Sequence, residues 1–179
     1  QASPEQRGKA EQAIANGHLA WHAMPFHWQT AMLAPSMMDG LLHYSRTLDT
    51  RFGKKTTGGK MSDVPGHTRG IIGPLAAAGV RLLDIGVNAA STAPEVPDIF
   101  LWRDPAGADL VMLYHHLDYG GTILIPGTTT AIAMEVRNDN SGPHTPAEIA
   151  ATYARLRRQF PNAAVHAANM SEVAAATDP

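Results

Sequence analysis

The residue best suited to chemistry is Asp63, which stands in the stretch KMSDVPGHTRGII between two apolar runs. Pro65 and Gly66 favour a tight turn directly after it. A carboxylate at the end of a strand can act as a nucleophile, a general base or a metal ligand. An aspartate at this place can equally cap the following helix or close an Asx-turn, and the residue types alone favour capping.

Two further polar clusters contain possible metal ligands. In YHHLDYGG, His116 and Asp118 form a His-x-Asp pair, whose nitrogen and oxygen could bind one zinc ion. In NDNSGPHT, the side chains of Asp139, Asn140 and His144 could reach ligand oxygens or a metal. The second cluster could also form a solvated turn with a helix cap, which is the commoner role of such residues.

Aromatic and basic side chains suggest a carbohydrate cleft. His27 lies in the aromatic stretch WHAMPFHWQT, and Trp102 and Arg103 lie in IFLWRD, after a proline-rich segment. Aromatic rings stack on the C–H faces of sugars, but they are also ordinary core material. Arg103 could bind a carboxylate or order its loop.

Strand and helix patterns alternate along the chain. Buried strands are expected at 18–23, 56–62, 80–87, 108–116, 130–136 and 163–168. Helices are expected at 4–16, 36–52, 71–79, 146–159 and from 171 onward. This alternation predicts an α/β protein with a mostly parallel sheet covered on both faces. The long segments 87–100 and 119–130 are expected to be functional loops at the carboxyl ends of the strands.

Composition narrows the function further. The chain has 179 residues, a formal net charge of -2 and no cysteine, so it can hold neither a disulfide nor a thiolate zinc site. The small charge gives no reason to expect nucleic acid or an anionic membrane as a partner. No apolar run approaches the roughly 20 residues of a spanning helix. We therefore expect a soluble protein, cytoplasmic or secreted. Walker, dinucleotide-binding and Gly-x-Ser-x-Gly motifs are absent from the sequence.

Several motifs in one order resemble glycoside hydrolase family 38, the retaining α-mannosidases. They are DVPGHT at 63–68, LLDIGVNAASTAPEVPDIFLWRD at 82–104 and YHHLDYGGT at 114–122. DVPGHT is similar to the nucleophile motif DPFGHS of that family, and FLWR at 100–103 matches a downstream stretch. The resemblance is greatest to a bacterial branch known as domain of unknown function 5054, and it covers almost the whole chain.

The resemblance implies a catalytic (β/α) barrel with a zinc ion at the carboxyl ends of its strands. Carried over by motif, Asp63 is both nucleophile and zinc ligand, and Asp118 is the candidate proton donor. The other residues expected at the site are the metal ligands His116 and His144 and the sugar-binding residues His27, His67, Trp102, Arg103, Asp139 and Asn140.

The sequence departs from the family in one respect. The family has a metal-binding His-x-Asp motif ahead of its nucleophile, and none precedes Asp63 here. We therefore expect 1–179 to be a single domain that forms the middle and C-terminal part of a longer, incomplete barrel. Its expected partners are a carbohydrate and either the rest of its own domain or a second copy. The alternatives are a metal-dependent carbohydrate deacetylase and a non-catalytic carbohydrate-binding fragment.

Overall fold

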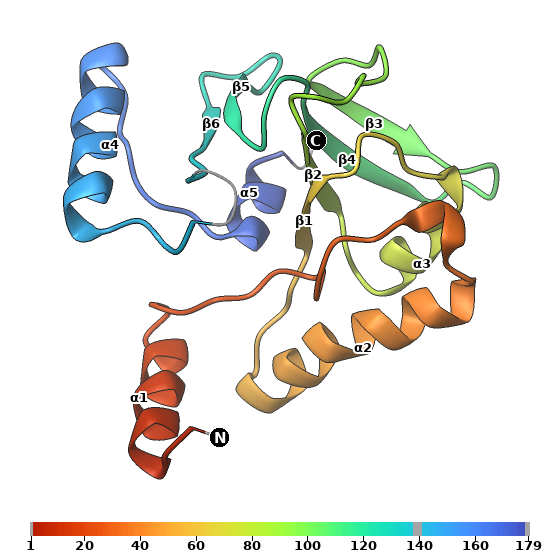
Figure 1. Cartoon of the computed structure of the whole chain (residues 1–179), viewed down its shortest axis with the longest axis horizontal. Coiled ribbons are helices and arrows are strands. Elements are labelled where there is room, and N and C mark those ends of the chain that lie inside the picture. The colour runs from red at the N-terminus through yellow and green to blue at the C-terminus, as the bar shows by residue number, and fades with distance from the viewer. Residues whose placement is uncertain (1, 138–140, 178–179) are drawn as a thin grey trace.

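The computed structural model describes residues 2–137 and 141–177, so Asp139 and Asn140 lie outside the described residues. The helices are α1 (Pro4–Ala15), α2 (Pro35–Phe52), α3 (Ile72–Ala77), α4 (Pro146–Gln159) and α5 (Met170–Ala176), with short 3₁₀ turns η1 (Thr30–Met32) and η2 (Arg69–Ile71). The strands are β1 (Gly58–Asp63), β2 (Leu82–Val87), β3 (Ile99–Arg103), β4 (Asp109–His115), β5 (Gly121–Leu124) and β6 (Ala131–Met134). Figure 1 shows their arrangement.

The centre of the molecule is a four-stranded sheet with the order β1-β2-β4-β3. The strands β1, β2 and β4 are parallel, whereas β3 runs antiparallel to β4. The strands β5 and β6 form a separate antiparallel hairpin. The predicted α/β class and mostly parallel sheet are therefore confirmed. The described strands do not close into a barrel.

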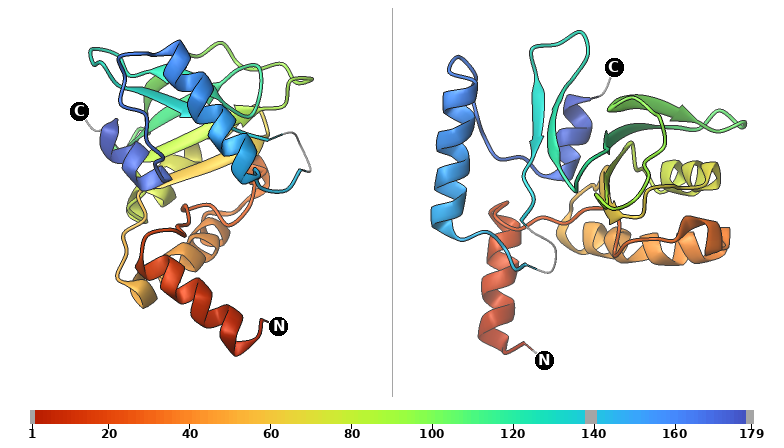
Figure 2. Two further views of the ribbon diagram at one scale, coloured as in Figure 1. Left: turned by 90° about the vertical axis from the view of Figure 1, so that its left-hand side faces the viewer. Right: turned by 45° about the horizontal axis from the view of Figure 1, so that its top comes forward.

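The two faces of the sheet are covered by different elements. The helices α2 and α3 pack on one face, and their core includes Leu42, Leu75 and Ile85. The hairpin and α5 pack on the opposite face, over Leu82 and Leu113 (Figure 2). Every residue of β2 is buried because both of its faces are covered, as its continuous apolar sequence predicts. The helix α1 projects away from the sheet (Figures 1 and 2).

Local sequence signals account for several element boundaries. Thr145 caps α4, and Glu148 completes the capping box that the sequence predicts. Gly53 ends α2 in the left-handed conformation, with φ of 62°. None of the helices in the described ranges is long and apolar enough to cross a bilayer.

Some predicted elements are wrong. The segment 18–23 is not a strand, although the N–H of Ala23 donates to the carbonyl of Gly58 on the neighbouring β1. The segment 163–168 also forms no strand. Both are short apolar runs, which periodicity alone cannot assign. The strand β5 lies inside the segment 119–130, which was expected to be a loop, and β3 begins at the end of the expected loop 87–100.

Candidate active site at the carboxyl end of the sheet

Asp63 is the last residue of β1 and its side chain is exposed at the carboxyl end of the parallel strands. Its Oδ1 accepts a hydrogen bond of 2.8 Å from the Asn88 amide and one of 3.0 Å from the Tyr119 hydroxyl. Its Oδ2 accepts no hydrogen bond from the described residues. One carboxylate oxygen is therefore held in place while the other remains available to a ligand.

The backbone at Asp63 is strained. Its φ of 81° makes it the only residue other than glycine with a positive φ in the described part of the chain. Such a conformation costs a side-chain-bearing residue about 1–2 kcal/mol, and aspartate is among the residues that tolerate it best. Strained residues of this kind occur often at functional sites.

The hydrogen bonds to Asp63 favour its charged form. Donation from Asn88, and secondarily from Tyr119, holds the pKa of the Asp63 carboxyl below its usual range. The carboxylate is therefore ionised at neutral pH. Asn88 is itself oriented, because its Oδ1 accepts from the N–H of Ala90 at 2.9 Å, which turns its Nδ2 toward Asp63.

The turn that follows Asp63 is anchored to other elements. The hydroxyl of Tyr114, on β4, donates to the carbonyl of Pro65. The N–H of Thr68 donates to Oγ1 of Thr30 at 3.0 Å. These contacts tie the turn to β4, which lies beyond β2 in the sheet, and to η1. Asp63 does not cap the following helix, which was one of its expected roles, because η2 and α3 both begin without a side-chain cap.

His67 points into the protein instead of toward the carboxylate. Its Nδ1 lies 3.3 Å from Oγ1 of Thr30, and its Nε2 is buried with no hydrogen-bond partner among the described residues. Burial lowers the pKa of His67 to about 4, so its ring is neutral at neutral pH. The position fits a role in anchoring the turn that carries Asp63.

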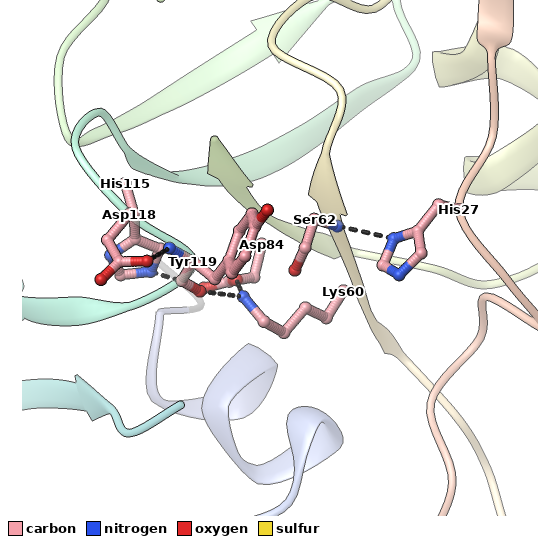
Figure 3. Close-up of polar contacts among 7 residues, drawn as sticks. All are labelled: His27, Lys60, Ser62, Asp84, His115, Asp118 and Tyr119. Carbon is pink, nitrogen blue, oxygen red and sulfur yellow. Dashed lines mark hydrogen bonds and ion pairs between the residues drawn. The ribbon is translucent and has the colours of Figure 1, made fainter. Parts of the chain in front are cut away.

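His27 is brought to the site. Its exposed ring accepts a hydrogen bond of 2.8 Å at Nδ1 from the N–H of Ser62, the residue before Asp63 (Figure 3). Of the sugar-binding residues expected from the sequence, His27 is the one that the described structure places beside Asp63.

Asp118 is exposed in the loop after β4, and its Oδ1 accepts a hydrogen bond of 2.7 Å from the N–H of Tyr119. The Asp118 carboxylate thus contacts the main chain of Tyr119 (Figure 3), and the hydroxyl of Tyr119 contacts Asp63. The two carboxylates expected to act together are linked through Tyr119 and share no direct hydrogen bond in the described structure.

The expected zinc ligands are dispersed. His116 lies 3.4 Å from Asp98 and stacks against Tyr114, and His144 precedes the N-cap of α4. Within residues 2–137 and 141–177, no group of three or more His, Asp or Glu side chains could hold a metal ion. Zinc therefore does not fit Asp63, His116 and His144 as a set, and we assign it no step.

Trp102 and Arg103 lie away from Asp63 because β3 is antiparallel. Arg103 is in register with Asp109, the first residue of β4, and donates to its carboxylate at 2.8 Å. The end of β3 thus meets the amino end of the parallel strands, opposite the carboxyl end that carries Asp63. Trp102 is partly buried and packs against the core on the α2 and α3 face of the sheet.

Asn88 and Tyr119 are the site residues that the sequence analysis missed. Asn88 directly follows β2, as the turn residues follow β1, and the carboxyl ends of adjacent parallel strands meet at one edge. That rule could have identified Asn88. Tyr119 comes from the long loop that was expected to be functional, but its partner could not be read from the sequence.

A cavity of about 390 Å³ lies elsewhere, between the segment 21–25 and α2. Its lining includes Trp21, His22 and Tyr44. It does not include Asp63 or the two residues that hold it, Asn88 and Tyr119.

Comparisons with protein-family models, with curated proteins and with solved structures gave no match. The site is therefore interpreted from its own geometry.

Proposed function

We propose that the chain is part of a carbohydrate-active hydrolase in which Asp63 is the nucleophile of retaining glycoside cleavage. The observation that carries the proposal is the exposed carboxylate of Asp63, which is held through Oδ1 by Asn88 and Tyr119 with Oδ2 open. A nucleophilic carboxylate must be ionised, fixed and accessible to the sugar. The lowered pKa of Asp63 supports the first of these requirements.

In the proposed reaction, Oδ2 of Asp63 attacks the anomeric carbon and forms a glycosyl ester. The bond to the leaving oxygen breaks, and a carboxylic acid protonates that oxygen. Water then hydrolyses the ester with the help of the same acid group. Asp118 is the candidate acid, because it is exposed and adjacent in sequence to Tyr119. In this proposal the four-stranded sheet is part of a (β/α) barrel of the family 38 type.

Covalent labelling tests the nucleophile. The protein is incubated with a mannosyl fluoride that carries a second fluorine on its ring, which slows hydrolysis of the ester. Mass spectrometry of the digested protein should find the sugar on the peptide that contains Asp63. Asp63→Asn should abolish the label. A labelled peptide that lacks Asp63 would overturn the assignment.

The matched control is Asp118→Asn. Fluoride leaves without an acid, so this variant should still accept the label. It should lose about 10²–10⁴-fold in the hydrolysis of mannosides with poor leaving groups, which need the acid. If Asp118→Asn lost as much activity with good leaving groups as with poor ones, Asp118 would not be the proton donor.

Non-catalytic sugar binding is the second candidate, because the expected metal ligands are dispersed among the described residues and the side-chain contact of Asp118 is with its own neighbour Tyr119. Retaining enzymes place their two carboxyl groups about 5–5.5 Å apart. Mannose binding detected by calorimetry, lost in Asp63→Asn but accompanied by neither labelling nor hydrolysis, would favour this function.

A further inference from the structure

Lys60, Asp84 and His115 form a buried charge network (Figure 3) on the face of the sheet that the hairpin covers. Asp84, in the middle of β2, has 0% of its surface exposed. One of its carboxylate oxygens pairs with the Lys60 ammonium, and the other lies 2.9 Å from Nε2 of His115. Lys60 and Asp84 are register partners on adjacent strands.

Such a network is costly to bury. Removing charges from water costs several kcal/mol per ion, and apolar side chains of similar volume often give equal or greater stability. Its place in the centre of the sheet is therefore weak evidence for a stabilising role. The network makes one further contact, which indicates another role: Lys60 Nζ donates a hydrogen bond of 2.8 Å to the main-chain carbonyl of Tyr119.

Gly86 allows the Tyr119 main chain to lie directly on β2. A Cβ at position 86 would come within 2.5 Å of both Cα and the carbonyl oxygen of Tyr119. No real Cβ atom makes such a contact, so the loop can occupy this place only above a glycine. Gly86 and Asp84 are two residues apart on β2, and thus on the same face of the sheet.

We propose that Lys60 is a positioning residue of the Asp63 site. Held by Asp84, its ammonium fixes the main chain of Tyr119 over Gly86, and the Tyr119 hydroxyl then orients Oδ1 of Asp63. The inference rests on the proposed function for its catalytic meaning. The geometric coupling of Lys60 to Asp63 is testable without any substrate.

A double-mutant cycle in the full chain tests this coupling. The pH titration of the Asp63 carboxyl carbon is followed by NMR in the unmodified protein, in Lys60→Met, in Tyr119→Phe and in the double variant. Each single change should raise the titration midpoint of Asp63. If Lys60 acts through Tyr119, the rise of the midpoint in the double variant should be smaller than the sum of the rises in the two single variants.

Additivity would overturn the proposal. Loss of the Lys60 charge also raises the midpoint by long-range electrostatics, but that effect adds to the effect of Tyr119→Phe. A sum of the two single shifts would therefore mean that Lys60 acts by charge alone. No shift in Lys60→Met would overturn the proposal as well.

A second variant leaves every charge in place, in case Lys60→Met does not fold. Gly86→Ala forces the Tyr119 main chain away from β2 and should raise the Asp63 midpoint as Tyr119→Phe does. Gly40→Ala is the matched control, because a Cβ at that position in α2 meets open space. It should leave the midpoint unchanged. An unchanged midpoint in a folded Gly86→Ala variant would overturn the proposal.

Labelling with the fluorinated sugar separates this inference from the proposed function. Non-additive titration without a label on Asp63 would support positioning and contradict catalysis. A label on Asp63 with additive titration would support catalysis and contradict positioning. If both hold, Lys60→Met should slow labelling about 10-fold, the equivalent of one lost hydrogen bond.

Discussion

The hydroxyl of Tyr119 donates a hydrogen bond of 3.0 Å to the carboxylate of Asp63, 56 positions earlier in the chain. It joins the end of β1 to the loop that follows β4, across the intervening β2. Asn88, which directly follows β2, donates to the same oxygen. Residues that follow two parallel strands, β2 and β4, thus hold one exposed carboxylate at the end of the third, β1.

Asn88→Ala should raise the pKa of Asp63 more than Tyr119→Phe does. The bond from Asn88 is the larger cause of the lowered pKa, and each bond favours the charged carboxylate. Carboxyl-carbon NMR titrations of the two variants measure the order directly. Asn16→Ala, at the end of α1, is the control and should leave the pKa of Asp63 unchanged. A larger rise in Tyr119→Phe would contradict the assigned order.

Glycine should be better tolerated than alanine at position 63. With φ of 81°, an alanine there is strained and a glycine is not, so Asp63→Gly should be about 1 kcal/mol more stable than Asp63→Ala. Urea unfolding monitored by circular dichroism gives both free energies of unfolding. The same pair at Asp118, which has no positive φ, should show the reverse order. A matching order at both sites would refute strain at Asp63.

The stability of the protein should fall as the pH is lowered from 6.5 toward about 4, because the unfolded chain protonates His67 in this range while the folded protein does not. The full effect is up to about 3 kcal/mol. Burial also lowers the pKa of His22, so that residue acts in the same direction. Urea unfolding of His67→Gln across this range should give a shallower slope than the unmodified protein.

Any further fall in the free energy of unfolding below about pH 4 has a different origin. The pKa values of Asp63 and Glu148 are lowered in the folded protein, so their contributions are present above their usual pKa values and are lost as the pH falls further. His67→Gln should leave this loss of stability below about pH 4 unchanged. Identical pH profiles with and without His67 would show that its ring is not buried in its neutral form.

Removal of divalent metal should leave the fold intact. The core consists of apolar side chains on both faces of the sheet, and the described residues form no three-ligand metal group. Dialysis against a chelator should therefore leave the thermal unfolding midpoint unchanged. His116→Gln should not alter any zinc affinity, because His116 pairs with Asp98. A lower midpoint after dialysis would place a structural metal in the protein.

The sequence predicted the strands that carry strong apolar runs, because β2 and β4 are buried on both faces or nearly so. It also predicted that Asp63 would stand at the end of a strand. It could not predict that β3 runs antiparallel, since the residues of a short apolar strand do not encode its direction. That single reversal moved Arg103 to the opposite end of the sheet.

The buried network was missed for a related reason. Lys60, Asp84 and His115 are far apart in the sequence, and Lys60 and Asp84 each stand alone within a glycine-rich or apolar run. Only the register of β1, β2 and β4 brings them to one face. Charge within a predicted buried strand was the available signal, because a buried aspartate requires a partner.

The close approach of the main chain at position 86 also sets a rule for engineering. Libraries that diversify the mouth of this sheet to obtain new binders can vary the exposed loop positions, but they should keep that glycine fixed. A side chain of any size there would displace the loop, and every downstream selection would then act on a differently shaped surface.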